Sequence, residues 1–256
     1  MADVPIPGMC RVKQRFDRDG ISDVAAVLRE KLNDEKLKAR IRPGMRVVLT
    51  GSSRQIANMP LILKELAAFV RAQGGEHCII PAMGSHGGAT AEGQKALLEG
   101  YGITEDYCGC PILSSMETVR VGQLPDGDEV CMDRFAHEAD AVIVVGRIKA
   151  HTTFRGTYES GLVKMMAIGM GKRAGADSLH RAGFGKMGER LPLYAKVVFD
   201  NCNVIFGVAP IENEFDQTCR IEVIPAEEIF DREPELLRYA KSRLPRILLP
   251  ETDVLI

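Results

Sequence analysis

Three histidines of this sequence stand in or beside glycine-rich segments, where an imidazole can act as an acid, a base or a metal ligand near neutral pH. His86 lies in the segment G-S-H-G-G, His151 ends the segment G-R-I-K-A-H, and His180 lies in D-S-L-H-R-A-G. A solvated loop histidine without a role is the alternative for each residue taken alone. His77 and His137 occupy an expected strand start and an expected helix end, and we interpret both as structural.

Lys164 is a candidate covalent nucleophile. It stands in the apolar stretch L-V-K-M-M, where partial desolvation would lower the pKa of its amine. The alternative is a lysine whose stem is buried while its charged end reaches the surface. Arg54, in the segment G-S-S-R, has the side chain to hold a carboxylate or phosphate with two hydrogen bonds, although an ordinary surface arginine fits the pattern equally.

These residues need a scaffold that brings them together, and the first half of the chain predicts one. Short apolar runs at 46–50 and 77–83 are typical of buried strands, and each is followed by a glycine-containing loop and a helix, at 60–73 and 90–100. This alternation predicts an α/β fold, a mostly parallel sheet with helices on both faces. Ligands bind at the carboxyl ends of parallel strands, so we expect all five candidate residues to line one crevice there.

The rest of the chain predicts a small insertion and further sheet elements. The turn signal P-D-G-D joins two short strands into a β-hairpin over 119–132. We expect later strands and helices in the segments 139–146 (strand), 186–201 (helix), 203–208 (strand), 219–224 (strand) and 227–243 (helix). Residues 253–256 resemble a strand that stops early, which favours a fragment of a longer protein over a finished edge strand. We predict one α/β domain over residues 1–256.

Composition and charge exclude several classes of protein. The chain has 256 residues, 45% of them hydrophobic and 27% charged, which is typical of a globular domain. Its net charge of −2, without a basic run, argues against a nucleic-acid partner. No apolar stretch approaches the roughly 20 residues that span a bilayer, so we expect no membrane partner. Seven cysteines without a recognisable leader predict reduced thiols and a cytoplasmic location.

Taken together, the motifs resemble the nickel-pincer lactate racemase family. The arginine loop, G-S-H-G-G, G-R-I-x-x-H, S-G-x-x-K and a downstream histidine follow one another in the family's order, from about Arg46 onward. Sixteen residues separate Lys164 from His180, which also fits the family. The resemblance implies the N-terminal catalytic domain of a two-domain enzyme, with its active site between the domains and its C-terminal domain missing after Ile256.

The resemblance also implies roles for the site residues. Its cofactor is a nickel-pincer nucleotide, pyridinium-3,5-bisthiocarboxylic acid mononucleotide with nickel, which dedicated biosynthetic enzymes supply. Lys164 would be the lysine joined to it, His180 would complete the nickel coordination, and His86 and His151 would be the acid/base pair. Arg54 would contact bound anions. The implied activity is an isomerase reaction, racemisation or epimerisation of a lactate-like 2-hydroxy acid through reversible hydride transfer.

Three departures from the family pattern alter the surroundings of the substrate, and one of them is a spacing from His151 to Lys164 that is a few residues longer than in the lactate enzymes. The chain reads S-G-L-V-K where family members often read S-G-G-A-K, and Gly51 stands where their first loop begins with aspartate. The particular 2-hydroxy acid and the oligomeric state therefore stay open. One alternative is an oxidoreductase or isomerase that uses another nucleotide, although no G-x-G-x-x-G follows the first strand. The other is a non-catalytic domain that binds an anion or a nucleotide.

Overall fold

The centre of the molecule is a five-stranded sheet. The structure is a computed structural model that describes residues 8, 11–181, 183–249 and 251. The strand order is β2-β1-β5-β6-β7; the first four strands are parallel, and β7 runs antiparallel to β6. The strand bounds are β1 Arg46–Gly51, β2 Glu76–Pro81, β5 Ala141–Val145, β6 Val204–Glu212 and β7 Thr218–Pro225. The prediction of a mostly parallel sheet is confirmed.

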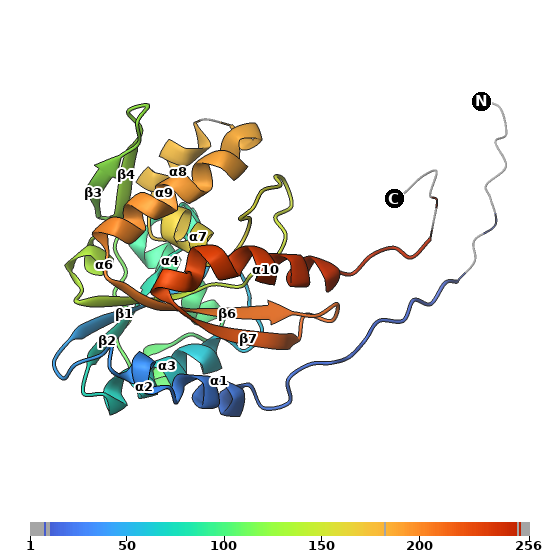
Figure 1. The fold of residues 1–256 in the computed structure, drawn as a ribbon, viewed down its shortest axis with the longest axis horizontal. Helices are drawn as coiled ribbons and strands as arrows, with labels where there is room; N and C mark the ends of the chain where they lie inside the picture. The colour runs from blue at the N-terminus through green and yellow to red at the C-terminus, as the bar shows by residue number, and fades with distance from the viewer. Residues whose placement is uncertain (1–7, 9–10, 182, 250, 252–256) are drawn as a thin grey trace.

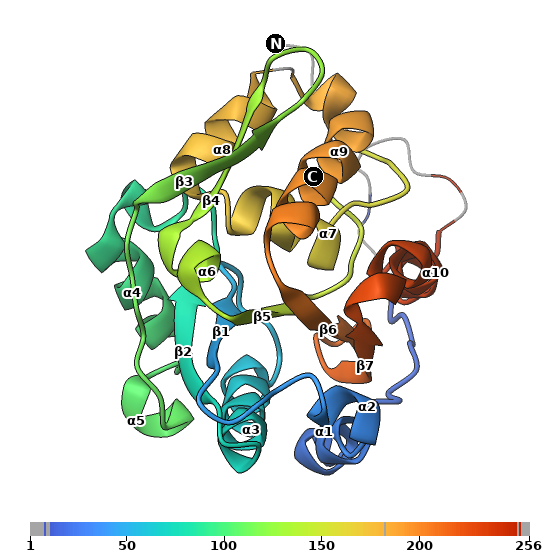
Figure 2. The same ribbon diagram turned by 60° about the vertical axis from the view of Figure 1, so that its left-hand side comes forward.

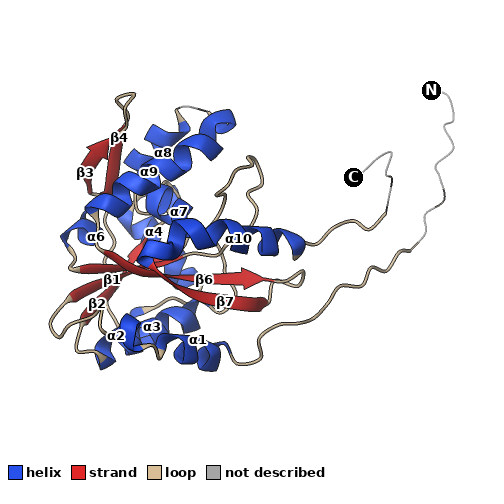
Figure 3. Cartoon of the chain, viewed as in Figure 1, coloured by secondary structure: helices blue, strands red, loops and turns tan. Residues whose placement is uncertain are grey.

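Helices cover both faces of this sheet, as Figures 1 and 3 show. Below it lie α1 (Val24–Leu32), α2 (Glu35–Lys38) and α3 (Met59–Ala72). Above it lie α6 (Arg134–Glu138), α7 (Leu162–Lys164), α9 (Met187–Asn201) and α10 (Ile229–Ser242). The central strand β5 reads A-V-I-V-V and is buried along its whole length, because both of its neighbours and both helical layers cover it.

The insertion between the two halves of the sheet is the predicted hairpin. It consists of β3 (Thr118–Gln123) and β4 (Glu129–Asp133), which form a separate antiparallel pair. The hairpin packs against α8 (Lys172–His180) and α9, at the top of Figure 1. At the left of Figure 2, α4 (Ala91–Gly100) runs beside the edge strand β2, and α5 (Glu105–Cys108) lies below it.

Sequence periodicity placed most of these elements but not all of them. The sequence patterns do not predict α1, α2, α5 or the helical segment 162–180. That segment contains α7, a π-helical turn at Met165–Gly169 and α8. Short 3-10 turns occur at Gly87–Ala89, Phe184–Lys186 and Ala226–Glu228. The expected strand at 253–256 lies outside the described residues. Within the described ranges, no helix has the length and apolar character needed to cross a membrane.

Candidate active site

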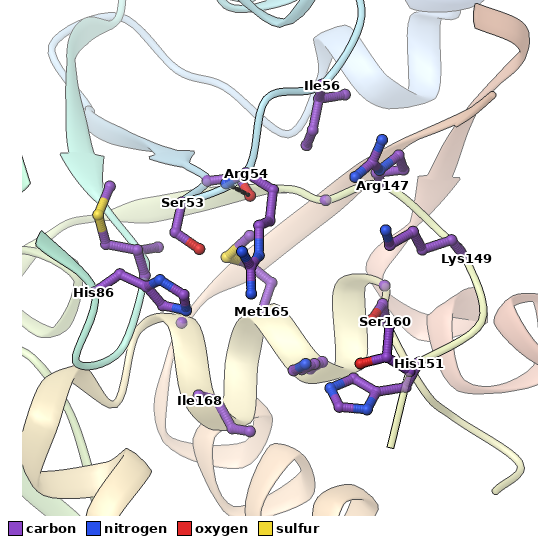
Figure 4. Close-up of a pocket in the computed structure, with 18 of the residues that line it drawn as sticks. Ser53, Arg54, Ile56, His86, Arg147, Lys149, His151, Ser160, Met165 and Ile168 are labelled. Carbon is purple, nitrogen blue, oxygen red and sulfur yellow. Dashed lines mark hydrogen bonds between the residues drawn. The ribbon is translucent and has the colours of Figure 1, made fainter. Parts of the chain in front are cut away.

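A pocket of about 360 Å³ opens beyond the carboxyl ends of β1, β2 and β5. Four of the five predicted site residues line it: Arg54, His86, His151 and Lys164. Figure 4 shows the rings of His86 and His151 on opposite sides of the pocket, with the side chain of Arg54 pointing into the space between them. The expectation of a shared crevice is confirmed for these four residues.

The first wall is the loop after β2, which carries His86. Gly84, Gly87 and Gly88 all have positive φ angles, and a Cβ at Gly87 would lie 2.7 Å from the backbone of Gly93. The glycines of G-S-H-G-G thus let the loop turn sharply against α4. The imidazole of His86 keeps exposed surface. Partial desolvation, together with the positive charges of Arg54 and Lys164, lowers the pKa of His86.

The second wall is the loop after β5, which carries His151. The backbone N–H of His151 donates to Oε2 of Glu159 at 2.7 Å, and Nδ1 of the ring accepts from the N–H of Thr153 at 3.1 Å. The ring also packs on Phe154, with 4.3 Å between the ring centroids. An Nδ1 that accepts a hydrogen bond has no proton, so the neutral ring carries its proton on Nε2. Desolvation and the charge of Lys164 lower the pKa of His151 to about 4.

Lys164 approaches the pocket from α7. Burial is the main reason why the pKa of its amine is lowered to about 8, and the charges of Arg54 and Lys149 lower it further. A substantial fraction of the amine is therefore neutral near pH 8 and able to attack a carbonyl-type carbon. Gly161 precedes this helix because the carboxylate of Glu233 fills the space in which a Cβ would stand. This close approach explains the glycine of S-G-x-x-K.

Positive charge dominates the lining of the pocket. Arg147 is paired with Glu212, but no hydrogen bond or ion pair within the described chain engages the guanidinium of Arg54 or the amine of Lys149. Burial and the neighbouring charge of Arg147 lower the pKa of Lys149. With Lys164, these side chains make a site suited to an anion. Arg147 and Lys149 precede His151 in the sequence, and only their positive charge indicates a role in anion binding.

The backbone of the first loop explains one departure noted in the sequence. A Cβ at Gly51 would lie 3.0 Å from Cδ2 of Leu98 and 3.4 Å from Cγ2 of Ile79. An aspartate in this place would have to displace the buried side chain of Leu98. Ser52 and Ser53, which follow directly, line the pocket instead.

The family model for the lactate racemase N-terminal domain matches residues 8–191, which is more than half of the chain. The chain belongs to the lactate racemase N-terminal domain family. Among solved structures, it is similar to the lactate racemase apoprotein from Thermoanaerobacterium thermosaccharolyticum, with 15% sequence identity and a TM-score of 0.52. That match covers 87% of this chain and 58% of the other, so this chain spans less than two thirds of the protein it resembles. No curated protein matches the sequence.

His180, a predicted residue of this racemase-family site, lies elsewhere. It is the exposed last residue of α8, its ring centroid is 5.7 Å from that of Phe184, and it is not among the pocket-lining residues. The expectation that it lines the crevice is wrong in this structure. Its neighbour Leu179 is fully buried, and one residue is a turn of about 100° around a helix, so His180 faces another direction. His77 and His137 lie outside the lining as well.

The pocket of this racemase-family domain fits the organic part of the implied cofactor better than its metal. A desolvated amine and unpaired cations suit a tethered, anionic nucleotide. Among the residues that the structure describes, no three His, Cys, Asp or Glu side chains form a group able to hold a metal ion. Nickel in this pocket would thus need donor atoms from the nucleotide itself, with a protein histidine adding one more.

Proposed function

We propose that this domain carries the tethering and proton-transfer residues of a racemase or epimerase that acts on a 2-hydroxy acid. The observation that carries the proposal is the arrangement of two histidines on opposite walls of one pocket, with Arg54 pointing into the space between them and the desolvated Lys164 in the same lining. Membership in the lactate racemase N-terminal domain family supports racemase chemistry. The 2-hydroxy acid and the nickel-pincer nucleotide are part of the proposal.

In this proposal Lys164 would hold the nucleotide through its amine, and His180 would supply a nickel ligand. Since His180 lies outside the pocket lining, the end of α8 would have to approach the pocket for that role. When bound, the nucleotide would supply an acceptor for the hydride that leaves the substrate carbon. This avoids removing that hydrogen as a proton, which would be difficult because it is only weakly acidic.

The chain's own residues would bind the substrate and move the hydroxyl proton. Arg54 can hold the substrate carboxylate with two N–H groups, because its guanidinium makes no hydrogen bond to any described residue. The histidine on one wall would accept the hydroxyl proton of one enantiomer, and the histidine on the other wall would serve the mirror image. A planar 2-keto acid would lie between the two enantiomers. Return of the hydride to its opposite face, with the proton returned to the carbonyl oxygen, would invert the carbon.

The partners of this proposed enzyme follow from the same chemistry. They are the small 2-hydroxy acid, the enzymes that build the nucleotide, and a second domain, because the similar solved racemase is longer than this chain. A cytoplasmic location belongs to the proposal too. The six described cysteines are all free thiols, which suits a reducing compartment.

The experiment that tests the proposal is an intact-mass measurement of protein produced with and without the cofactor-building enzymes, together with its nickel content. We expect a mass adduct that disappears in Lys164→Ala. Lys149→Ala is the matched control, because it removes another lysine of the same pocket and should keep the adduct. An adduct that persists in Lys164→Ala would eliminate Lys164 as the tether.

A non-catalytic, anion-binding domain is the second candidate, and the positive pocket favours it. It predicts no adduct under any production condition. Instead, inorganic phosphate or a nucleotide would bind to the parent protein, and this binding would be lost in Arg54→Ala and in Lys149→Ala alike. Racemisation of a 2-hydroxy acid by the loaded protein would exclude this candidate.

A further inference from the structure

Lys172 is a fully buried lysine that the proposed reaction does not use. Its Nζ donates to the carbonyl oxygen of Pro81 at 2.5 Å and to Oε1 of Gln94 at 3.2 Å, and it pairs with Oδ2 of Asp133 at 3.0 Å. The side chains of Lys172 and Asp133 are both 0% exposed. Two hydrogen-bond acceptors and one carboxylate thus surround the ammonium.

Gln94 extends this network to the loop of His86. Its side chain is also fully buried, and its Nε2 donates to the carbonyl oxygens of Gly84 at 2.9 Å and His86 at 3.2 Å. Lys172 and Gln94 together bind three carbonyls of the segment 81–86. The N–H of Gly84 adds a bond to the carbonyl oxygen of Gly169, at the end of the helical turn that follows Lys164.

The backbone of Lys172 is unusual as well. Its φ is +52°, a left-handed conformation that ordinary residues rarely adopt. A buried ammonium and a left-handed lysine are both unfavourable by themselves, and such features tend to persist where the geometry of a site requires them. Lys172 stands eight residues after Lys164 in the same helical segment, 162–180. The network therefore links the segment that carries Lys164 to the loop of His86.

We infer that Lys172 and Gln94 are positioning residues that fix the loop of His86, and therefore its imidazole, relative to Lys164. The inference rests on the proposed function, in which His86 transfers a proton. Neither side chain lines the pocket, so neither touches the substrate. Within the described part of the chain, the imidazole of His86 makes no hydrogen bond, which leaves the loop backbone as its main constraint.

The test uses Gln94→Met, which keeps the length of the side chain and removes both N–H donors. Lys172 retains Pro81 and Asp133 as partners, so we expect the protein to fold. In the cofactor-free protein, the imidazole resonances of His86 should shift and the amides of residues 84–86 should exchange at least about tenfold faster. In the loaded protein, kcat should fall roughly ten- to a hundredfold with KM changed less than about threefold, the effect of a displaced catalytic group.

Two further variants keep the test decisive. Gln94→Asn shortens the side chain without changing its charge, and it replaces Gln94→Met if that variant does not fold. Glu159→Gln is the matched control on the other wall, where it should move the resonances of His151 and leave those of His86 in place.

A folded Gln94 variant with unchanged His86 resonances, unchanged amide exchange and a kcat within twofold of the parent would overturn the inference. Such a protein could still show a lower melting temperature, which a purely structural network would produce. If the loaded parent racemises no 2-hydroxy acid, the proposed function fails. The His86 resonances of the cofactor-free variants would still decide the positioning of the loop.

Discussion

The two walls of the pocket hold their histidines in different ways. On the His86 wall, neutral amide donors and a buried lysine bind backbone carbonyls, and the imidazole itself has no recorded partner. On the His151 wall, the buried carboxylate of Glu159 binds the backbone, and the ring is fixed by the N–H of Thr153. His151 therefore has a fixed tautomer when neutral, whereas either tautomer of His86 is compatible with its surroundings.

This asymmetry gives the two histidines different starting states. A neutral His151 presents an Nε2–H group that can donate a hydrogen bond, and it must exchange tautomer before Nε2 can take a hydroxyl proton. A neutral His86 can carry its free lone pair on either ring nitrogen. Both have a lowered pKa, so both are neutral at physiological pH. The carboxylate of Glu159 opposes the lowering at His151, but desolvation and the charge of Lys164 outweigh it.

Removing either histidine tests the comparison with the largest expected effect. His86→Ala and His151→Ala should each lower the rate of racemisation by about a hundred- to ten-thousandfold, because each enantiomer needs both groups in one turnover. The measurement is racemisation by cofactor-loaded protein, with single-turnover absorbance for each enantiomer. If both variants racemise at the parent rate, the acid/base assignment is wrong.

His180→Ala is the companion variant to this pair. It should weaken nickel retention and leave the covalent adduct on Lys164, because the change removes a predicted ligand and not the tether. Full nickel retention under challenge with a chelator would end the ligand hypothesis for His180.

Glu159→Ala probes what holds the second wall. The carboxylate is fully buried and accepts from the backbone N–H groups of His151 and Gly156 and from Nζ of Lys241. Losing these charge-assisted bonds should lower the free energy of unfolding by about 2–3 kcal/mol. Chemical denaturation measures it. Lys241→Met, which removes one donor and keeps the carboxylate, should cost less. Equal losses in the two variants would show that the backbone bonds contribute little.

The scaffold was easier to predict than the groups that hold the site. Short apolar runs and the helix start at Pro60 placed β1 and α3 within about a residue, and β2 within about two residues, of their observed bounds. His86 and His151 were found because each follows a strand of the parallel sheet. Local pattern carries both kinds of information.

The supporting contacts, by contrast, join residues far apart in the chain. Lys172 reaches Pro81 across 91 positions, and Glu233 reaches Val163 across 70. No periodicity reports such a pair, since a buried lysine and a surface lysine look alike in sequence. His180 is the opposite case. Its spacing from Lys164 suggested a shared site, but its position at the end of α8 leaves its side chain exposed and outside the pocket lining.

The charge of Lys164 acts on both walls, and Lys164→Met tests how unequally. Removing the charge should raise the pKa of His151 above about 4 and also raise the pKa of His86, because a nearby cation disfavours a protonated imidazole. The larger rise should occur at His151, where Lys164 is the strongest electrostatic influence. The measurement is an NMR titration of the cofactor-free protein. Lys164→Arg keeps the charge and should leave both pKa values low.

The last expected effect is on the pH dependence of stability and concerns Glu233, which binds the start of α7. Its Oε2 accepts from the N–H of Val163 at 3.0 Å, its side chain is fully buried, and burial raises its pKa to about 7. The folded protein therefore holds this proton more tightly than the unfolded chain, in which a glutamate has its ordinary pKa of 4.5. Stability from this group is complete below pH 4.5 and is lost as the pH rises to about 7.

Glu233→Gln should abolish that loss, because an amide stays neutral at every pH. The free energy of unfolding of the parent should fall relative to the variant by roughly 2–3 kcal/mol between pH 4.5 and 7, and the difference should be constant above pH 8. Urea denaturation at a series of pH values measures it. His151 works in the opposite direction, since its lowered pKa makes stability rise with pH between about 4 and 6.5, and it is present in both proteins. Parallel curves for parent and variant would mean that Glu233 is ionised in the folded protein throughout, with Val163 and the start of α7 stabilising its charge.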